Sequence, residues 1–260
     1  MKITGKFANA EAYDRNTGRF SRMLARPFIE FAGVEDGERL LDVGCGTGAV
    51  AFTAAALTRR GEIVGIDPSA AFIEHARSRT SDPRISFDVG NALTLPYPDG
   101  SFSKCLSLLV IQFIPDVRRA ISEMRRVTRT GGTVAACVWS RDDDPLHTIF
   151  WDSAAELDPA AKGARDIRAY AQGQLSALWV ESGFSSMEET VLVIAPEFES
   201  FDGYWKPLVR GQGPSSSYLE GLAPDKQEAL RLRVRERVLG KGPDRPFTLG
   251  AKAWSVRGLR

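Results

Sequence analysis

Five short apolar segments alternate with helical segments through the middle of this 260-residue chain. Each is rich in Val, Ile or Leu and too short for a helix, so we predict strands at residues 39–43, 62–66, 85–89, 103–110 and 133–139. The stretches between them carry apolar residues at helical spacing. Strands and helices that alternate in this way pack as a parallel sheet with helices on both faces. We therefore predict an α/β fold of the doubly wound, Rossmann-like type.

The rest of the chain is expected to complete this sheet and to add helices to it. Residues 187–195 and 247–256 have strand patterns, giving a mostly parallel seven-stranded sheet with an antiparallel last strand. Between these two strands, residues 201–209 and 224–239 have helical patterns, and the connection is too long for a hairpin. We predict an N-terminal helical segment (1–37), a core (38–195), an inserted helical cap (196–245) and a final core strand (246–260).

Charge and composition argue against several classes of function. The chain has 34 Lys and Arg against 33 Asp and Glu, a net charge of +1, whereas binders of nucleic acid or anionic membranes usually have a basic excess. No apolar run approaches the ~18 residues that span a bilayer, and MKITGKFANAEAYDR at the start does not resemble a signal peptide. Cys45, Cys105 and Cys137 are expected to be reduced thiols of a cytoplasmic protein.

A glycine-rich turn after the first strand is the strongest functional signal. LDVGCGTG places Gly44, Gly46 and Gly48 directly before a helix, where glycine lets the backbone approach a ligand and the helix N-terminus offers free N–H groups. Asp67 ends the second strand, where a carboxylate can accept hydrogen bonds from both hydroxyls of a ribose. Asn91 follows the third strand and can meet an adenine edge. These positions share one sheet edge and predict an adenosine derivative as the ligand.

Two ligands of this kind compete, a nicotinamide dinucleotide and S-adenosylmethionine. The pattern Gly44-x-Gly46-x-x-Ala49 satisfies the dinucleotide fingerprint in form. Asp42 disfavours it, because a carboxylate repels a pyrophosphate but attracts the ammonium and sulfonium groups of S-adenosylmethionine. We favour S-adenosylmethionine, and a nicotinamide-dependent oxidoreductase is the weaker alternative.

Five ordered motifs resemble the class I S-adenosylmethionine-dependent methyltransferases, in particular the methyltransferase-11 and ubiquinone/menaquinone-biosynthesis-like group. LDVGCGTG is similar to the first motif of that family and GIDPSAAFIEHAR to the second. VGNALTLPYPDGSFS, SLLVIQFIPD and EMRRVTRTGGTVAACVW resemble the next three. The resemblance covers roughly residues 30–195 and implies methyl transfer from S-adenosylmethionine, with S-adenosylhomocysteine as the product.

The resemblance also implies cofactor contacts at the matching positions. Asp42 would lie near the ammonium group, and the motif residues along the methionine and ribose would be Gly44, Cys45, Gly46 and Gly48. Asp67 would bind the ribose hydroxyls and Pro68 would pack beside the adenine. Asn91, followed by Ala92, stands where the family usually has aspartate, but its amide can still accept a hydrogen bond from adenine.

Further implied contacts lie outside these strand exits. Leu109 and Gln112 would lie by the methionine moiety and the methyl group. An N-terminal helix would cover the cofactor, which makes Tyr13, Arg19 and Arg22 candidate partners of its carboxylate.

Two side chains are candidates for catalytic roles. Gln112 can orient a nucleophile or a water by hydrogen bonding, or it can satisfy backbone groups at a helix start. His147 follows the fifth strand near the expected substrate entrance, as a general base or as a surface or capping residue. The second histidine, His75, is expected on a solvated helix face.

Other clusters have structural interpretations. The run from Asp142 to Asp144 is interpreted as a solvated loop rather than as metal ligands, and no metal is expected. Four alternating arginines from Arg231 to Arg237 flank an apolar helix face. The aromatic residues of the second half are expected to pack the cap and, as a set, to line an apolar pocket.

Together these patterns predict a methyltransferase that acts on a small apolar or aromatic molecule by in-line displacement. Because the methyl donor is already activated, the protein has chiefly to align the reactants and exclude water. The alternative is an S-adenosylmethionine-binding regulatory or assembly protein that transfers no methyl group.

Overall fold

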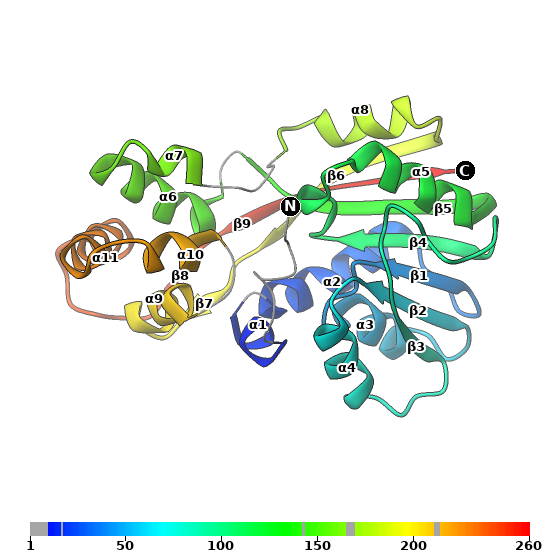
Figure 1. The fold of residues 1–260 in the computed structure, drawn as a ribbon, viewed down its shortest axis with the longest axis horizontal. Coiled ribbons are helices and arrows are strands. Elements are labelled where there is room, and N and C mark those ends of the chain that lie inside the picture. The colour runs from blue at the N-terminus through cyan, green and yellow to red at the C-terminus, as the bar shows by residue number, and fades with distance from the viewer. Residues whose placement is uncertain (1–9, 17, 142–143, 165–169, 211–213) are drawn as a thin grey trace.

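One sheet of seven strands organises the molecule (Figure 1). The computed structural model describes residues 10–16, 18–141, 144–164, 170–210 and 214–260. The strands are Arg39–Val43 (β1), Glu62–Asp67 (β2), Ile85–Val89 (β3), Phe102–Leu108 (β4), Thr128–Trp139 (β5), Ser185–Ile194 (β6) and Ala251–Leu259 (β9). Their order is β3-β2-β1-β4-β5-β9-β6, with β1 to β5 parallel and β9 antiparallel to both neighbours. The predicted sheet, with its antiparallel last strand, is confirmed.

Helices cover both faces of this sheet. One face is packed by α2 (Gly18–Ala32), α3 (Ala49–Leu57) and α4 (Ala70–Ser78), and the other by α5 (Val117–Val127) and α8 (Gln174–Glu181). Leu40 enters the first core and Leu41 the second, because successive strand residues point to opposite faces. Burial on both faces explains the apolar runs of the central strands such as β1 and the second half of β5. In the described residues, no helix has the length and apolar character needed to cross a bilayer.

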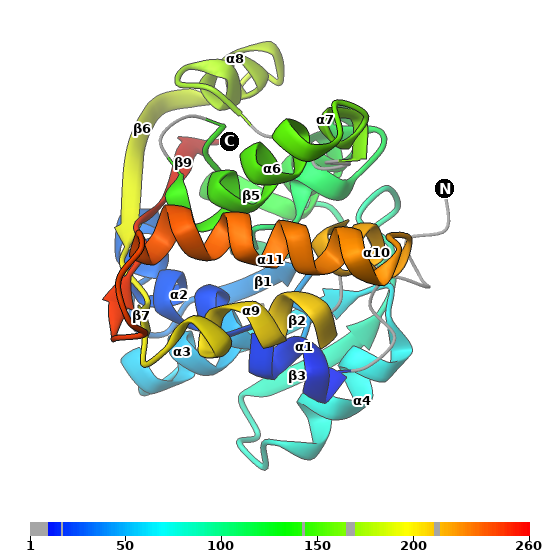
Figure 2. The same cartoon turned by 90° about the vertical axis from the view of Figure 1, so that its left-hand side faces the viewer.

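A second group of helices, the cap lobe, lies beyond the carboxyl ends of the strands (Figures 1 and 2). It consists of α6 (Pro145–Leu157), α7 (Ala161–Ala164), β7 (Glu197–Phe198), α9 (Phe201–Arg210), α10 (Pro214–Glu220), α11 (Pro224–Leu239) and β8 (Phe247–Thr248). α11 packs on α6, and α10 on α7 and α9. Inside it the rings of Phe201 and Trp205 stack with centroids 6.0 Å apart, and Phe150 packs on Trp205 at a tilt.

The N-terminal helix α1 (Ala10–Asn16) lies between the two groups, against α4 and α9 (Figure 2). It precedes α2 and is separated from it by one residue outside the described ranges. This position brings α1 close to the glycine turn after β1.

Some element boundaries differ from those expected. β5 begins at Thr128, so Gly131 and Gly132 lie inside the strand instead of before it. Gly132 has a packing reason, because an added Cβ would lie 2.7 Å from the Ser103 carbonyl oxygen. α5 begins at Val117, where the Asp116 carboxylate caps it by accepting from the Arg119 N–H at 2.9 Å.

Candidate functional site

The glycine turn joins β1 to α3 with three residues in the left-handed region. Gly44, Gly46 and Gly48 have φ of 76°, 53° and 92°, which only glycine adopts without strain. A side chain at Gly44 would overlap Val110, and one at Gly48 would lie 2.8 Å from the Phe52 ring. The turn is therefore a bare backbone cradle directly before a helix N-terminus, as the sequence predicted.

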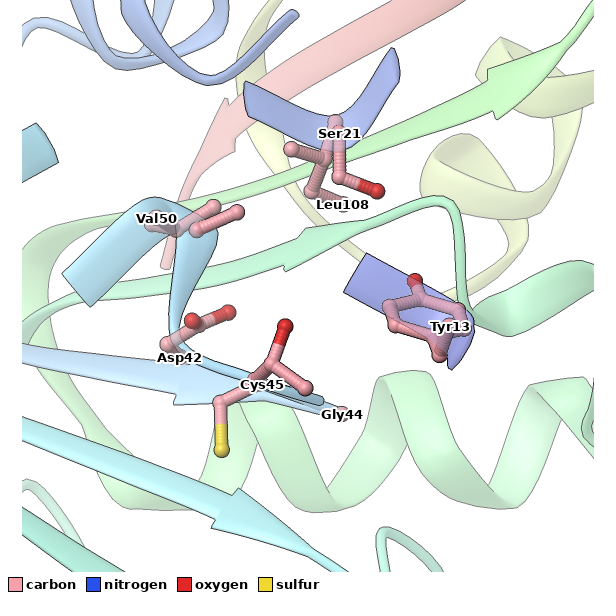
Figure 3. Close-up of a pocket in the computed structure, with 9 residues that line it drawn as sticks. Tyr13, Ser21, Asp42, Gly44, Cys45, Val50 and Leu108 are labelled. Atoms are coloured by element: carbon pink, nitrogen blue, oxygen red, sulfur yellow. The ribbon is translucent and has the colours of Figure 1, made fainter. Parts of the chain in front are cut away.

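A small pocket of about 280 Å³ lies beside this turn (Figure 3). Asp42 and Cys45 form one side of it, and Tyr13 from α1 and Ser21 from α2 lie across from them. The residues that line it are Tyr13, Ser21, Asp42, Gly44, Cys45, Thr47, Ala49, Val50 and Leu108. Part of this volume is open to solvent, so the enclosed space is well below that of a usual ligand pocket, about 300–1,000 Å³.

Asp42 is the most unusual group in the pocket. Its side chain is 1% exposed, and its Oδ2 has no hydrogen-bond partner among the described residues. Burial, with Asp67 nearby, raises the pKa of Asp42 to about 8, against one backbone hydrogen bond from Ala51 that lowers it. A buried carboxylate of this kind is stabilised when a cation lies beside it. The ammonium and sulfonium groups of S-adenosylmethionine fit this requirement.

Asp67, at the end of β2, is held by the glycine turn. Its Oδ2 accepts from the Gly46 N–H at 3.0 Å and its Oδ1 from the Ser69 N–H at 2.8 Å. Burial raises the pKa of Asp67 despite these two bonds. Each oxygen keeps a lone pair, so the carboxylate can still accept from a pair of ribose hydroxyls. Pro68 follows it and is exposed.

The other predicted cofactor contacts lie near the carboxyl ends of β1 and β3. Asn91 is exposed after β3, and its Oδ1 accepts from the Leu93 N–H at 2.9 Å, while Ala92 is half-buried. Cys45 lines the pocket, and burial together with Asp42 and Asp67 raises the pKa of its thiol well above the usual range. A protonated thiol beside the turn acts as a small apolar wall.

α1 is fastened over the turn by one carboxylate that the sequence analysis missed. Asp14 accepts from the Thr47 hydroxyl, from Arg22 Nη1 at 3.3 Å and from Arg79 Nη1 at 2.8 Å. His75 Nε2 lies 3.3 Å from Asp14 Oδ2. We call these five residues the Asp14 clasp. It engages Arg22, and it makes the expected solvated position of His75 wrong, since that ring is half-buried against α1.

Tyr13 and Arg19 take different places. The Tyr13 ring packs on Phe72 at a centroid distance of 4.9 Å and borders the pocket. Arg19 instead lies against the cap lobe, with its guanidinium carbon 4.6 Å from the centroids of Phe20 and Phe198. Burial lowers the pKa of Arg19, and its Nε has no partner in the described part of the chain.

The exits of β4 and β5 hold Leu109 and Gln112. Leu109 is buried with a φ of 60°, a left-handed conformation that is strained for a branched residue. Gln112 is 4% exposed in the short 3-10 helix Ile111–Phe113. Its Oε1 accepts from the Trp139 N–H at 3.1 Å, and its Nε2 has no partner among the residues described.

His147 lies in the first turn of α6, next to the end of β5. Its Nδ1 is 2.7 Å from Oδ2 of Asp144, and its ring centroid is 4.7 Å from that of Trp139. Asp144 is fully buried, so its assignment to a solvated loop was wrong. The sequence analysis treated the three consecutive aspartates alike and did not single out Asp144. The pattern Asp-Pro-x-His at a helix start was a usable signal for it.

Asp142 and Asp143 lie outside the described residues. Within the described ranges, no group of three or more His, Cys, Asp or Glu side chains is placed to hold a metal ion.

Comparisons with known proteins relate the chain to methyltransferases. The family model described as "Methyltransferase domain" matches residues 41–136. The chain is 31% identical to the demethylmenaquinone methyltransferase of Roseiflexus castenholzii over 62% of this chain and 71% of that protein. It is 28% identical to the 2-phytyl-1,4-naphtoquinone methyltransferase of Synechococcus elongatus, over 67% of this chain and 84% of that protein.

Two further matches differ in extent. A 37.1 kDa protein of transposon TN4556 from Streptomyces fradiae is 41% identical over 43% of this chain, and the match spans only 33% of that protein. The crystal structure of YcgJ from Bacillus subtilis has a TM-score of 0.61 at 18% identity, covering 93% of this chain and 98% of that one, and so shares the fold. The chain belongs to the class I S-adenosylmethionine-dependent methyltransferases, in the methyltransferase-11 group that includes quinone methyltransferases.

Proposed function

We propose that this enzyme transfers the methyl group of S-adenosylmethionine to a small apolar or aromatic acceptor bound between the sheet edge and the cap lobe. The observation that carries the donor side is Asp42, a buried carboxylate with an oxygen that lacks a partner among the described residues, beside a bare glycine turn. A cationic ligand supplies the missing interaction.

Different residues at the carboxyl edge of the sheet would contact different parts of the donor. Gly44, Cys45, Gly46 and Gly48 would lie along its methionine and ribose, with Asp42 near the ammonium group. Asp67 would accept from the ribose hydroxyls, and Pro68, Asn91 and Ala92 would border the adenine. Tyr13 would cover the donor from α1, with Arg19 and Arg22 as candidate partners of its carboxylate and Leu109 beside the methyl group.

The acceptor side would be formed where the cap lobe faces β4 and β5. The named quinone methyltransferases among the relatives support a ring-bearing acceptor. Tyr204 and Trp205 are fully packed within the lobe, and the Tyr204 hydroxyl donates to the Leu146 carbonyl at 3.2 Å, so their role is to shape it. The segments 1–37 and 196–245 would then act as covers of a core formed by 38–195 and 246–260.

The chain's own contribution to the reaction is alignment. The bound donor supplies an activated methyl group, so orientation and exclusion of water account for most of the acceleration expected. Gln112 would orient the acceptor or a water through its free amide donor while its oxygen stays on the Trp139 N–H. No metal is required in this scheme, and the buried, unpaired thiols of Cys45, Cys105 and Cys137 suit a reducing cytoplasm.

A direct test incubates the protein with methyl-labelled S-adenosylmethionine and a panel of phenols, quinols and amines. Transfer of label to an acceptor supports the proposal. Tight binding of S-adenosylmethionine without transfer to any acceptor favours the regulatory or assembly role instead. Thermal stabilisation by NAD and not by S-adenosylmethionine would favour the oxidoreductase.

A further inference from the structure

A largely buried polar cluster, of which only His147 is partly exposed, lies at the exits of β4 and β5, outside the pocket described above. It consists of His147, Asp144, Gln112 and the backbone of Trp139. We infer that His147, oriented by Asp144, is the general base that removes a proton from a hydroxyl group of the acceptor. This inference rests on the proposed methyl transfer and adds a substrate class, hydroxylated acceptors, to it.

The geometry favours one tautomer of His147. Its Nδ1 lies 2.7 Å from Oδ2 of Asp144, which is entirely buried, and a carboxylate oxygen accepts a hydrogen bond from a ring N–H. In the inferred tautomer Nδ1 carries the hydrogen, and Nε2 keeps its lone pair. The His147 side chain is 27% exposed, so it is accessible although its partner is not. A base held in one tautomer by a buried carboxylate is the arrangement that general-base catalysis uses.

The surroundings connect this base to the donor site. Trp139 contacts the His147 ring and donates its N–H to Gln112, which follows β4 by four residues. Leu108, the last residue of β4, lines the donor pocket, and the next residue, Leu109, donates its N–H to the Cys137 carbonyl of β5 at 2.7 Å. A base and an orphaned amide donor thus lie at the edge where the acceptor has to approach. An acceptor hydroxyl group suits both groups, because it can give its proton to the base while its oxygen accepts a hydrogen bond from the amide.

The proposed step balances as follows. The acceptor O–H proton moves to His147 Nε2, and the oxygen electron pair forms a bond to the methyl carbon. The carbon–sulfur bond breaks, and its electrons remain on sulfur, which becomes a neutral thioether. The positive charge now resides on the imidazolium, next to Asp144, and the exposed edge of the ring returns the proton to solvent.

The first test reads the tautomer without any turnover. The chain has two histidines, so their ring nitrogens give two separable sets of NMR signals. We expect His147 to be protonated at Nδ1 in the neutral form, and Asp144→Asn to abolish that preference while the signals of His75 stay in place. A His147 ring protonated at Nε2 in the folded wild-type protein overturns the inference.

The second test uses acceptors that need a base to different extents. Para-substituted phenols from p-nitrophenol to p-methoxyphenol become progressively harder to ionise. His147→Gln is expected to lower kcat about 100-fold or more for p-methoxyphenol, much less for p-nitrophenol, and to change KM about threefold at most. Asp144→Asn should reproduce this dependence on the phenol in weaker form, with circular dichroism confirming that it folds.

Glu156→Gln is the matched control. Glu156 lies on α6, the helix that carries His147, but its ion pairs are with Arg233 and Arg237 of α11, away from the cluster. This variant should leave the whole series unchanged. Equal losses across the phenols in His147→Gln, or methylation confined to amines and thiols, would overturn the inference while the proposed function stands. If no acceptor of any class is methylated, the proposed function fails, and the NMR result alone decides the arrangement of the pair.

Discussion

At the scale of single residues, Asp42 makes the strongest link between physical chemistry and function. A carboxylate excluded from water and facing a second carboxylate costs free energy unless it is protonated or meets a cation. The folded protein holds this proton up to about pH 8, whereas the unfolded chain releases it near the usual pKa of 3.8.

The pH dependence of stability follows from this difference. Between about pH 4 and 8 unfolding releases a proton, so the free energy of unfolding of the ligand-free protein should fall as pH rises, by up to about 1.4 kcal/mol per pH unit. Asp42→Asn cannot ionise and should be more stable than wild type at pH 8 but similar at about pH 4 and below. Thermal melts across this range measure the effect.

The same variant should lose S-adenosylmethionine affinity at least about tenfold, or roughly 1.4 kcal/mol. Asp88→Asn on β3 is the control, since Asp88 accepts from the Tyr97 hydroxyl and does not line the pocket. If Asp42→Asn binds S-adenosylmethionine as wild type does, the ammonium contact is assigned to the wrong residue.

Gln112 combines a structural bond with a free donor, and Gln112→Leu removes both. We expect a lower melting temperature, because the buried Trp139 N–H loses its acceptor at a cost of about 1–3 kcal/mol. Separately, turnover measured well below that melting temperature should fall tenfold or more, with S-adenosylmethionine affinity retained.

Gln174→Leu on α8 is the comparison, because it also removes an amide oxygen that accepts from a backbone N–H, that of Ala171. It should keep full turnover. A Gln112→Leu enzyme that is less stable but equally fast would assign Gln112 a purely structural role.

The positions of site residues were predictable from the sequence where the local backbone dictates them, and not where tertiary contacts do. Asp67 and the glycines follow from strand exits, a local property. Asp144 and Asp14 do not, because only the packed structure decides which carboxylate of a polar stretch is buried and which groups from distant segments reach it.

At the scale of elements, α1 is held by polar side-chain contacts in addition to the packing of Tyr13 on Phe72. The Asp14 clasp joins it to the glycine turn through Thr47 and to α4 through Arg79. Because the pocket beneath is small, α1 has to yield when a whole donor molecule enters.

Asp14→Ala should therefore raise the dissociation rate of S-adenosylmethionine about tenfold, since α1 loses several charge-assisted hydrogen bonds that hold it over the pocket. Stopped-flow displacement measures this rate. Glu30→Ala, which removes the exposed ion pair with Arg26 on α2, should leave it unchanged. A dissociation rate equal to that of wild type in Asp14→Ala would mean that α1 does not gate the pocket.

Elements with a strong period were predicted almost to the residue. The strands 39–43 and 85–89 and the helix 224–239 agree with the structure, because an apolar run or an apolar helical face bounded by Pro or Gly fixes both ends. The short helix α10 was missed, since its Ser215, Ser216 and Ser217 have weak helical preference and are held by contacts to α9. The predicted strand at 133–139 starts later than β5, which begins at Thr128, because Gly131 and Gly132 resemble a turn.

At the scale of the whole molecule, the net charge is close to zero, and the alternating arginines of α11 are engaged in contacts within the protein. Arg231 pairs with Asp202, and Arg233 and Arg237 pair with Glu156 on α6. Arg235 donates to the Gly242 carbonyl. The alternating arginines thus connect helices of the cap lobe.

Nucleic acid should accordingly bind weakly, with a Kd of about 10⁻⁴ M or above at physiological salt. Fluorescence anisotropy with a labelled RNA oligonucleotide, repeated as salt is raised, measures it. Sub-micromolar binding that persists at physiological salt would contradict this expectation.

The antiparallel pairing of β6 with β9 also has a consequence for how such a chain can diverge. Ile194 and Ala251 are cross-strand partners, so the segment between them leaves the sheet and returns to it at one point. The entropy of closing a loop grows only with the logarithm of its length. Mutation can therefore lengthen, shorten or replace this segment at little cost to the sheet, and acceptor choice can evolve while the donor site stays as it is.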